Sequence, residues 1–192
     1  MSEERIKILG ITGPSGCGKD TAARWLEENF PNRYKYVKLH TTRPQRNEED
    51  NGYYFYSSED FLAQVLNGNM LNAQEFRGWY YGLHKEALYP GYINVLPMNN
   101  EMIMQMTDEN RTDYILRILY INTNPKERLL HILNREESPD CYEICRRFIS
   151  DDYDYEDNHY LHSLCEYEII NNYTSLFYKT LQRNAEACFA GD

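Results

Sequence analysis

Apolar residues in this chain fall into short continuous runs, and polar segments with helix-forming composition separate them. Such runs are typical of strands in a parallel sheet that is covered on both faces. The predicted strands are Ile6–Ile11, Tyr36–Leu39, Tyr92–Leu96, Tyr114–Ile121 and Tyr167–Ile170. Alternation of strands with helices predicts an α/β fold, a three-layer sandwich with a parallel sheet in the middle.

Capping residues mark where helices begin between these strands. Asn124 precedes a proline at the first helical position, and Ser57 precedes a turn with two acidic residues. Ser138 opens a further helix, and a last helix is predicted from about Thr174 to Ala187. These signals place helices on both sides of the predicted sheet.

The segment from residue 41 to 83 breaks this rhythm. It is rich in Tyr, Asn and Gly, and it predicts short strands at Tyr53–Tyr56 and Met70–Phe76. It begins at the carboxyl end of the second predicted strand, where ligands bind in open α/β sheets. We therefore expect a single domain over residues 1–192, with a core of 1–40 and 84–192 and a small mixed α/β insertion at about 41–83 that forms half of a cleft.

A glycine-rich loop directly follows the first predicted strand and precedes a helical stretch. Strand, glycine-rich loop, lysine and helix in this order are typical of a phosphate-binding P-loop. Its backbone N–H groups would hold phosphate oxygens, and Lys19 would reach the outer phosphates of a nucleotide. The predicted ATP-binding residues here are Gly13, Ser15, Gly16, Cys17, Gly18, Lys19, Asp20 and Thr21. The alternative is a glycine-rich turn without a ligand.

Position 20 departs from the usual P-loop pattern. A Ser or Thr hydroxyl normally contacts Mg²⁺ there, whereas this chain has Asp20. A carboxylate is also a hard oxygen ligand, so Asp20 is a candidate Mg²⁺ ligand. It also brings a negative charge close to the phosphates.

A second set of residues suits an anion. Arg43 and Arg46 lie three residues apart on a proline-stiffened loop, and Tyr53 and Tyr81 follow, the latter on a predicted turn. Guanidinium groups and phenol hydroxyls together could hold a second phosphate opposite the P-loop. Surface ion pairs with the acidic residues at 48–50 are the alternative.

Composition limits the remaining possibilities. The chain has a formal net charge of −10, which disfavours non-specific binding to nucleic acid. Its five cysteines show no metal-ligand spacing, and no run is long enough to span a membrane, so we expect a soluble cytoplasmic protein. The acidic run 151–157 predicts a solvated surface, and His159 with His162 is not expected to bind metal.

The order of these motifs resembles the guanylate kinase family of nucleoside monophosphate kinases. Four segments carry the resemblance: Gly13–Thr21, Thr41–Arg46, Asn51–Ser57 and Gly78–Gly82. A late segment, Glu168–Asn172, is also similar to that family's last strand and turn. The resemblance implies ATP and Mg²⁺ as cofactors, nucleotides as partners without nucleic acid or membrane, and a monomer or homodimer.

The resemblance also implies roles for single residues. Arg43, Arg46, Tyr53 and Tyr81 match the residues that hold the acceptor phosphate, and Lys19 matches the lysine that bridges donor phosphates. Arg135 and Arg147 match arginines of a helical lid at about 133–147 and of the helix behind it. Lys19, Arg43, Arg135 and Arg147 are thus the implied catalytic residues. Asn171 falls near the adenine-contacting residue, and His131 falls where another lid arginine is expected.

Three positions that read guanine in the family differ here. Leu39 and Leu83 stand in place of serines, and Asn72 stands in place of a glutamate. One amide cannot accept from guanine N1–H and N2–H together as a carboxylate does, so we expect an altered acceptor. The alternative is divergence within ordinary guanylate kinases that still use guanine. Asn94 and Leu96 also stand where the family has two aspartates, which leaves the choice between Asp20 and Asn94 as metal ligand open.

The sequence therefore predicts ATP-dependent phosphoryl transfer to a nucleoside monophosphate whose base need not be guanine. Two alternatives stay open. The pair Lys19-Asp20 is similar to ribose 1,5-bisphosphokinase, a guanylate kinase-like enzyme with a sugar-phosphate acceptor. The missing strand-end carboxylates fit a non-catalytic guanylate kinase-like binding module, although such a module has no need of Lys19.

Overall fold

A five-stranded parallel sheet forms the centre of the protein. The computed structural model describes residues 5–45, 52–76, 78–107, 113–134, 139–151, 154–155 and 158–191. In spatial order the strands of this sheet are β2 (Tyr34–Tyr36), β7 (Ile93–Pro97), β1 (Ile6–Thr12), β8 (Tyr114–Asn122) and β9 (Tyr167–Ile170). Their pairings are all parallel, as continuous apolar runs buried on both faces require.

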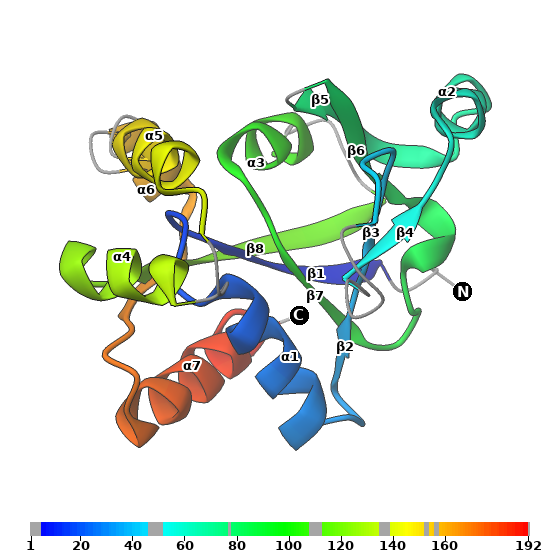
Figure 1. Ribbon diagram of the computed structural model, residues 1–192. Helices are drawn as coiled ribbons and strands as arrows, with labels where there is room; N and C mark the ends of the chain where they lie inside the picture. Colours follow the sequence, from blue (N-terminus) through cyan, green and yellow to red (C-terminus); the bar gives the residue numbers. More distant parts are fainter. Residues whose placement is uncertain are drawn as a thin grey trace.

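Helices cover both faces of this sheet (Figure 1). Helices α1 (Lys19–Asn29) and α7 (Ser175–Ala187) pack on one face, where Leu26 and Leu181 join the core. Helix α3 (Asn100–Met106) and helix α6 (His159–Leu164) pack on the other. Helices α4 (Pro125–Leu133) and α5 (Cys141–Asp151) follow the carboxyl end of β8. The predicted three-layer α/β fold is confirmed.

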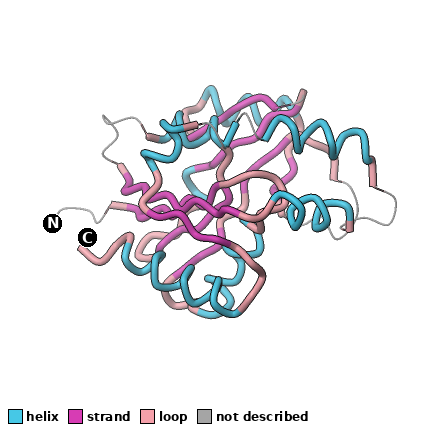
Figure 2. The backbone as a smooth tube through the Cα atoms, turned by 90° about the vertical axis from the view of Figure 1, so that its left-hand side faces the viewer, coloured by secondary structure: helices cyan, strands magenta, loops and turns pink. Residues whose placement is uncertain are grey.

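A second, smaller sheet stands beside the first. Its four strands, in spatial order, are β4 (Tyr53–Phe55), β3 (Leu39–Thr41), β6 (Trp79–His84) and β5 (Met70–Phe76). Helix α2 (Ser58–Leu66) covers one of its faces, where the rings of Phe61 and Tyr80 stack 5.6 Å apart. A short 3₁₀ turn, η1 (Lys85–Ala87), leads from this sheet back to β7. The tube view in Figure 2 shows the two groups of strands.

Two local predictions are wrong, and one helix was not predicted. The predicted strand Tyr36–Leu39 is two strands in two sheets, because β2 ends at Tyr36 and β3 begins at Leu39. Tyr81 lies inside strand β6 rather than on a turn. Helix α3, which covers the sheet with Met102 and Ile103, follows β7 without any prediction from the sequence.

Capping predictions hold where the structure describes them. The Ser57 hydroxyl accepts from the Asp60 N–H at 3.0 Å, and the Asn124 side chain accepts from the Lys126 N–H at 3.0 Å. Ser138, predicted to open a helix, lies outside the described residues, and α5 begins at Cys141.

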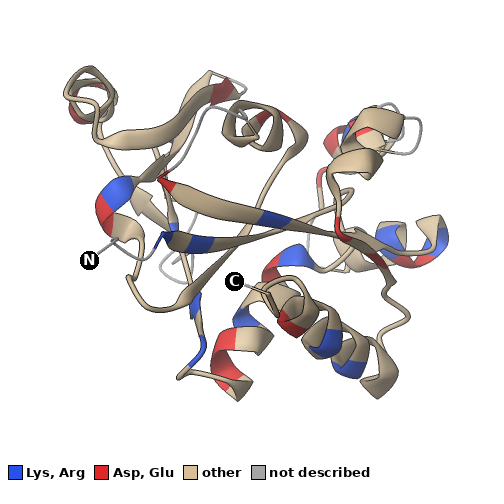
Figure 3. Cartoon of the chain, turned by 180° about the vertical axis from the view of Figure 1, so that it is seen from behind, with Lys and Arg blue, Asp and Glu red and all other residues tan. Residues whose placement is uncertain are grey.

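Charges of both signs share the surface helices. Figure 3 shows acidic and basic segments interleaved on α1 and α7 rather than gathered on separate faces. Helix α1 contains Asp20, Arg24 and Glu27, and α7 contains Arg183 and Glu186. None of the described helices combines the length and the apolar character that crossing a membrane requires.

Candidate active site

The glycine-rich loop connects β1 to α1 at the carboxyl end of the central strand. Gly13, Gly16 and Gly18 have φ values of 137°, 80° and 95°, which side chains rarely adopt. A Cβ atom at Gly13 would lie 2.3 Å from the Ile121 carbonyl oxygen, so this position also has no room for a side chain. Loop and helix thus have the geometry of a phosphate-binding site at a helix N-terminus.

Lys19 lies over this loop. Its Nζ donates to the Gly13 carbonyl at 2.6 Å and to the Pro14 carbonyl at 3.0 Å. Burial alone lowers the pKa of Lys19, but interactions with Cys17, Tyr155, Asp20 and Asp151 outweigh it and raise the pKa above its ordinary value. The ammonium group is therefore protonated at neutral pH and lies against the start of the loop.

Side chains from distant segments hydrogen-bond to the backbone of the loop. The Asn171 amide donates to the Cys17 carbonyl at 2.9 Å, and the Thr123 hydroxyl donates to the same oxygen at 3.3 Å. The Asn171 Oδ1 also accepts from the Tyr173 N–H, so both ends of this amide are engaged by the protein. Asn171, predicted to contact ATP, thus lies beside the loop, and its contact with ATP stays a prediction.

Tyr173 is a residue of this region that the sequence did not reveal. Its hydroxyl donates to the Gly16 carbonyl at 3.0 Å, and its ring stacks on His131 with centroids 4.0 Å apart. Its φ of 55° is unusual for a residue other than glycine. The stack joins α4 to the segment after β9 beside the loop.

Another missed contact comes from the acidic run 151–157. Asp151, the last residue of α5, is only 9% exposed, and its Oδ2 accepts from the Ser15 N–H at 2.8 Å. Tyr155 is buried as well. The prediction that this run is a solvated surface is wrong at these two positions, because the chain folds back over the P-loop here.

Most of the remaining predicted residues lie on one face of the second sheet. Residues directly opposite one another on neighbouring strands project to the same face. Tyr81 is opposite Gln74 and Thr41, Leu83 is opposite Asn72, and Tyr53 is opposite Leu39. The predicted base positions Leu39, Asn72 and Leu83 therefore share a face with the predicted phosphate-binding residues Tyr53 and Tyr81. Leu83 itself is fully buried in the core cluster on this side.

Arg43 follows β3 and lies against this face. Its guanidinium carbon is 5.4 Å from the centroid of the Tyr53 ring, and the Tyr53 and Tyr81 rings are 5.8 Å apart. Its Nη1 donates to the Pro44 carbonyl at 2.9 Å. Three of the four predicted acceptor-phosphate residues are thus neighbours. Arg46, the fourth, lies outside the described residues.

Two buried amides on this face lack part of their hydrogen bonding. Among the described residues, neither Asn72 Oδ1 nor Gln74 Oε1 has a hydrogen-bond partner, although the side chains are only 4% and 8% exposed. The Asn72 amide nitrogen donates to Gln105 of α3. An unsatisfied buried acceptor costs about 1–3 kcal/mol, so each of these oxygens is a candidate acceptor for a donor group of a ligand. Gln74 was not predicted, although its place two residues after Asn72 in a strand would have indicated it.

Tyr36 connects the two regions. Its hydroxyl donates to Asp20 at 3.4 Å, and the Arg24 guanidinium lies 4.4 Å from the centroid of its ring. Burial, then Asp20, raises the pKa of Tyr36 above its ordinary value, and Tyr53 contributes in the same direction. Gly52 is a second link, because a Cβ atom there would lie 3.8 Å from Arg24. The loop helix and the start of β4 are therefore neighbours.

Asp20 is the better of the two proposed metal ligands. It is exposed in the first turn of α1, directly after Lys19. Asn94 is fully buried near the opposite end of β7, where its amide bonds to the backbone of Lys7, Tyr89 and Tyr92. A metal role for Asn94 is wrong for this reason. In the part of the chain that the structure describes, no three His, Cys, Asp or Glu residues gather as a metal site.

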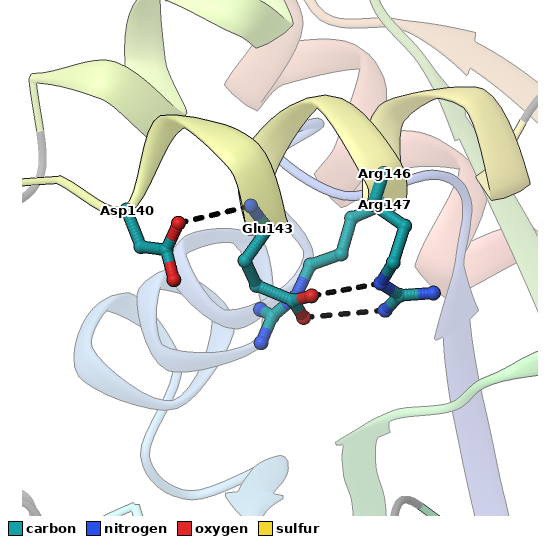
Figure 4. A network of polar contacts seen from close by, with 4 residues as sticks. All are labelled: Asp140, Glu143, Arg146 and Arg147. Atoms are coloured by element: carbon teal, nitrogen blue, oxygen red, sulfur yellow. Dashed lines mark hydrogen bonds and ion pairs between the residues drawn. The ribbon is translucent and has the colours of Figure 1, made fainter.

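The predicted lid arginines are only partly described. Arg147 lies on α5, and its Nε donates to Glu143 at 2.8 Å, while Arg146 pairs with the same carboxylate at 2.7 Å (Figure 4). Asp140 accepts from the Glu143 N–H at 3.1 Å. Arg135 lies outside the described residues. Glu143 thus holds Arg147 along the helix.

A cavity of about 210 Å³ lies elsewhere. Its lining includes Arg5, Lys7, Arg33 and Tyr92, which cluster at the amino ends of β1 and β7. The P-loop follows the carboxyl end of β1, so this cavity is at the opposite end of the strands from the residues above. None of the predicted site residues lines this cavity.

Comparisons with known proteins agree with this arrangement. The family model described as guanylate kinase matches residues 5–136. A guanylate kinase from Nostoc sp. is 44% identical over 84 residues, which cover 43% of this chain and 42% of the relative. A guanylate kinase from Enterococcus faecalis is 42% identical over 84 residues, which cover 43% and 41%. The match therefore spans less than half of these relatives' length.

Two further similarities extend the picture. Protein lin-2 of Caenorhabditis elegans is 35% identical over 91 residues, which are 46% of this chain and 9% of that protein. A crystal structure of guanylate kinase from Anaplasma phagocytophilum superposes with a TM-score of 0.64 at 22% identity. It covers 99% of this chain and 88% of that one, which supports the same fold throughout.

Proposed function

Because this chain belongs to the guanylate kinase family, we propose that it transfers a phosphoryl group from ATP to a nucleoside monophosphate. The single observation that carries the proposal is the pair of neighbouring anion sites. Lys19 and the glycine-rich loop form one, and Arg43 with Tyr53 and Tyr81 forms the other. The Tyr36 hydroxyl donates to Asp20 in the helix after the loop, and the same helix lies near Gly52 at the start of β4.

Phosphoryl transfer requires positioning and charge neutralisation more than covalent chemistry from the protein. In the proposed reaction, the loop N–H groups bind the donor phosphates and Lys19 neutralises the outer ones. Arg43, Arg46, Tyr53 and Tyr81 hold the acceptor phosphate in line. Arg147, with Arg135, would reach the transferring group after leaving Glu143.

A magnesium ion fits this donor set. Mg²⁺ usually binds one or two carboxylates and completes its shell with substrate phosphates and water. Asp20, exposed beside Lys19, would supply the carboxylate. When bound, the ion would neutralise phosphate charge.

The acceptor base is the finer part of the proposal. Asn72 Oδ1 and Gln74 Oε1 together offer two acceptors, so a second amide compensates for the carboxylate that the family has at position 72. Guanine presents a ring N–H and an amino group side by side and can satisfy both. Adenine has an amino group beside a ring acceptor, so it would leave one oxygen unpaired. We therefore propose a guanine nucleotide as the preferred acceptor.

A panel of acceptors tests this function. Purified protein with Mg·ATP would be offered every ribo- and deoxyribonucleoside monophosphate, and ribose 1,5-bisphosphate. We expect guanine nucleotides to have the highest kcat/KM. Preference for ribose 1,5-bisphosphate would establish the sugar-phosphate alternative. No turnover together with no Mg·ATP binding in calorimetry would establish the binding module. The cytoplasmic location and the monomer or homodimer stay predictions.

A further inference from the structure

One contact in the loop has no place in the reaction above. The Ser15 N–H belongs to the group of backbone donors that is proposed to bind phosphate, and it donates instead to Asp151 at 2.8 Å. The two residues are 136 positions apart, so only the tertiary fold brings them together. A carboxylate at this distance from an N–H group makes a charge-assisted hydrogen bond.

Asp151 acts on the rest of the loop as well. Its charge contributes to the raised pKa of Lys19, after the effects of burial, Cys17, Tyr155 and Asp20. Lys19 itself donates to the Gly13 and Pro14 carbonyls, at 2.6 and 3.0 Å, rather than to this carboxylate. Asp151 is therefore a nearly buried anion beside the cation and the N–H group that a phosphate would use.

We propose that Asp151 is a nucleotide surrogate: in the nucleotide-free protein its carboxylate takes an anion position of the P-loop, and it lowers the affinity for ATP. Two anions cannot share this position without strong repulsion, so phosphate binding requires the carboxylate to leave Ser15. Asp151 is the last residue of α5, which also carries Arg147. Release of Asp151 thus frees the carboxyl end of the helix that holds an implied catalytic arginine. This inference rests on the proposed binding of ATP at the loop.

Calorimetry on full-length variants tests the proposal. Asp151→Asn keeps an acceptor of the same shape without the charge, and Asp151→Ala removes both. Loss of a charge-assisted hydrogen bond of about 1.5 kcal/mol corresponds to about tenfold tighter binding of Mg·ATP. The matched control is Asp154→Asn. It removes the same charge from an exposed side chain three residues after Asp151. We expect its affinity to stay within about twofold of the unmodified protein, because charge effects at the surface are small.

Three results would overturn the proposal: unchanged affinity in both Asp151 variants, weaker affinity in Asp151→Asn, or equal tightening in Asp154→Asn. Thermal melting of each variant verifies that it is folded. The Ser15 amide resonance in ¹⁵N-labelled, nucleotide-free protein provides an independent readout. It should shift in Asp151→Asn and on titration with inorganic pyrophosphate, but not in Asp154→Asn.

The two proposals fail in different ways. If no form of the protein binds ATP, the kinase function fails, and the Ser15 resonance still decides the contact with Asp151. An unchanged resonance in Asp151→Asn would then overturn the surrogate. If ATP binds and turnover occurs while Asp151→Asn has unchanged affinity, only the surrogate fails.

Discussion

The P-loop and the second sheet, the two proposed anion sites, are built in opposite ways. In the loop, residues that are close in sequence make the site, and Lys19 donates to two of its carbonyls. Asn171, from a distant segment, bonds to Cys17 and Tyr173 beside it. In the second sheet, four short strands bring distant residues to one face, and Asn72 and Gln74 retain unpaired buried oxygens among the described residues.

This difference has a physical meaning. The loop is held by its local glycine conformations and by the bonds of Asn171 and Thr123 to Cys17, so binding requires Asp151 to leave Ser15 but little change in the loop itself. A face with unsatisfied buried acceptors gives up stability that only a ligand with matching donors restores. The donor site is therefore expected to be generic for nucleoside triphosphates, and the acceptor site is expected to discriminate.

The largest effect should come from Lys19→Ala. Removal of the only ammonium group in the loop eliminates charge neutralisation during transfer, and kcat should fall by about 10³-fold or more. Steady-state kinetics with Mg·ATP measures it. The matched control is Lys85→Ala, at an exposed position of η1, which should leave kcat unchanged. Near-normal turnover in Lys19→Ala would refute the role of the P-loop as the donor-phosphate site.

Gly13→Ala tests how rigid the loop is. A methyl group 2.3 Å from the Ile121 carbonyl, at a φ of 137°, should destabilise the fold by about 3–4 kcal/mol. Gly68 is the control, because it also has a positive φ of 70° but open space around it, and its replacement by Ala should cost about 1 kcal/mol. Urea unfolding measures both. Equal losses would mean that backbone strain, and not close packing, governs the loop.

The second sheet should show a distinct pH dependence through His40. Burial, then His84, lowers the pKa of His40 to about 4, while the unfolded chain has an ordinary pKa near 6.5. Below pH 6.5 only the unfolded state takes up this proton, so stability falls as the pH decreases from about 6.5 to 4. The loss is on the order of 3 kcal/mol, because each pKa unit corresponds to about 1.4 kcal/mol.

Unfolding at pH 7 and pH 4.5 measures this loss. His40→Gln should lose less stability between these two pH values than the unmodified protein. His159→Gln, at an exposed position, should lose as much as the unmodified protein. Identical pH dependence in all three proteins would contradict a neutral His40 beneath the sheet.

Arg43→Ala should affect binding of the acceptor without affecting binding of the donor ATP. Loss of a guanidinium that binds phosphate should raise the acceptor KM by about 30-fold, since charged hydrogen bonds contribute about 2 kcal/mol. The Kd for Mg·ATP in calorimetry should not change. Arg183→Ala, on the exposed side of α7, is the control for loss of a positive charge. An unchanged acceptor KM and kcat would refute the role of Arg43.

The smallest effect should come from Gln74→Leu, and its sign is diagnostic. Replacement of an unsatisfied buried amide should stabilise the empty protein by about 1 kcal/mol and reduce the preference for guanine over adenine nucleotides about tenfold. Gln64→Leu should instead destabilise, because Gln64 accepts from Asn69 at 2.8 Å and contacts His84 at 3.2 Å. If Gln74→Leu also destabilises the protein, the Gln74 amide stabilises the fold as the Gln64 amide does, and it is not reserved for a ligand.

Local patterns predicted the core of the fold well. The strand Tyr167–Ile170 has the predicted bounds, and the caps at Ser57 and Asn124 lie where the sequence indicated. These features depend on backbone and side-chain preferences of a few consecutive residues. Tyr36–Leu39 was misjudged, because one apolar run can supply two strands when the chain passes between sheets at Val37.

The sequence by itself determined the loop, because strand, glycines, Lys19 and helix follow one another and their conformations are local. Only the tertiary structure decided that Gln74 and Tyr81 share a face with Thr41 of β3, and that Asp151 reaches Ser15. Strand register sets the first, and packing of α5 against the loop sets the second. Both arise from contacts between residues far apart in the chain, which no local pattern encodes.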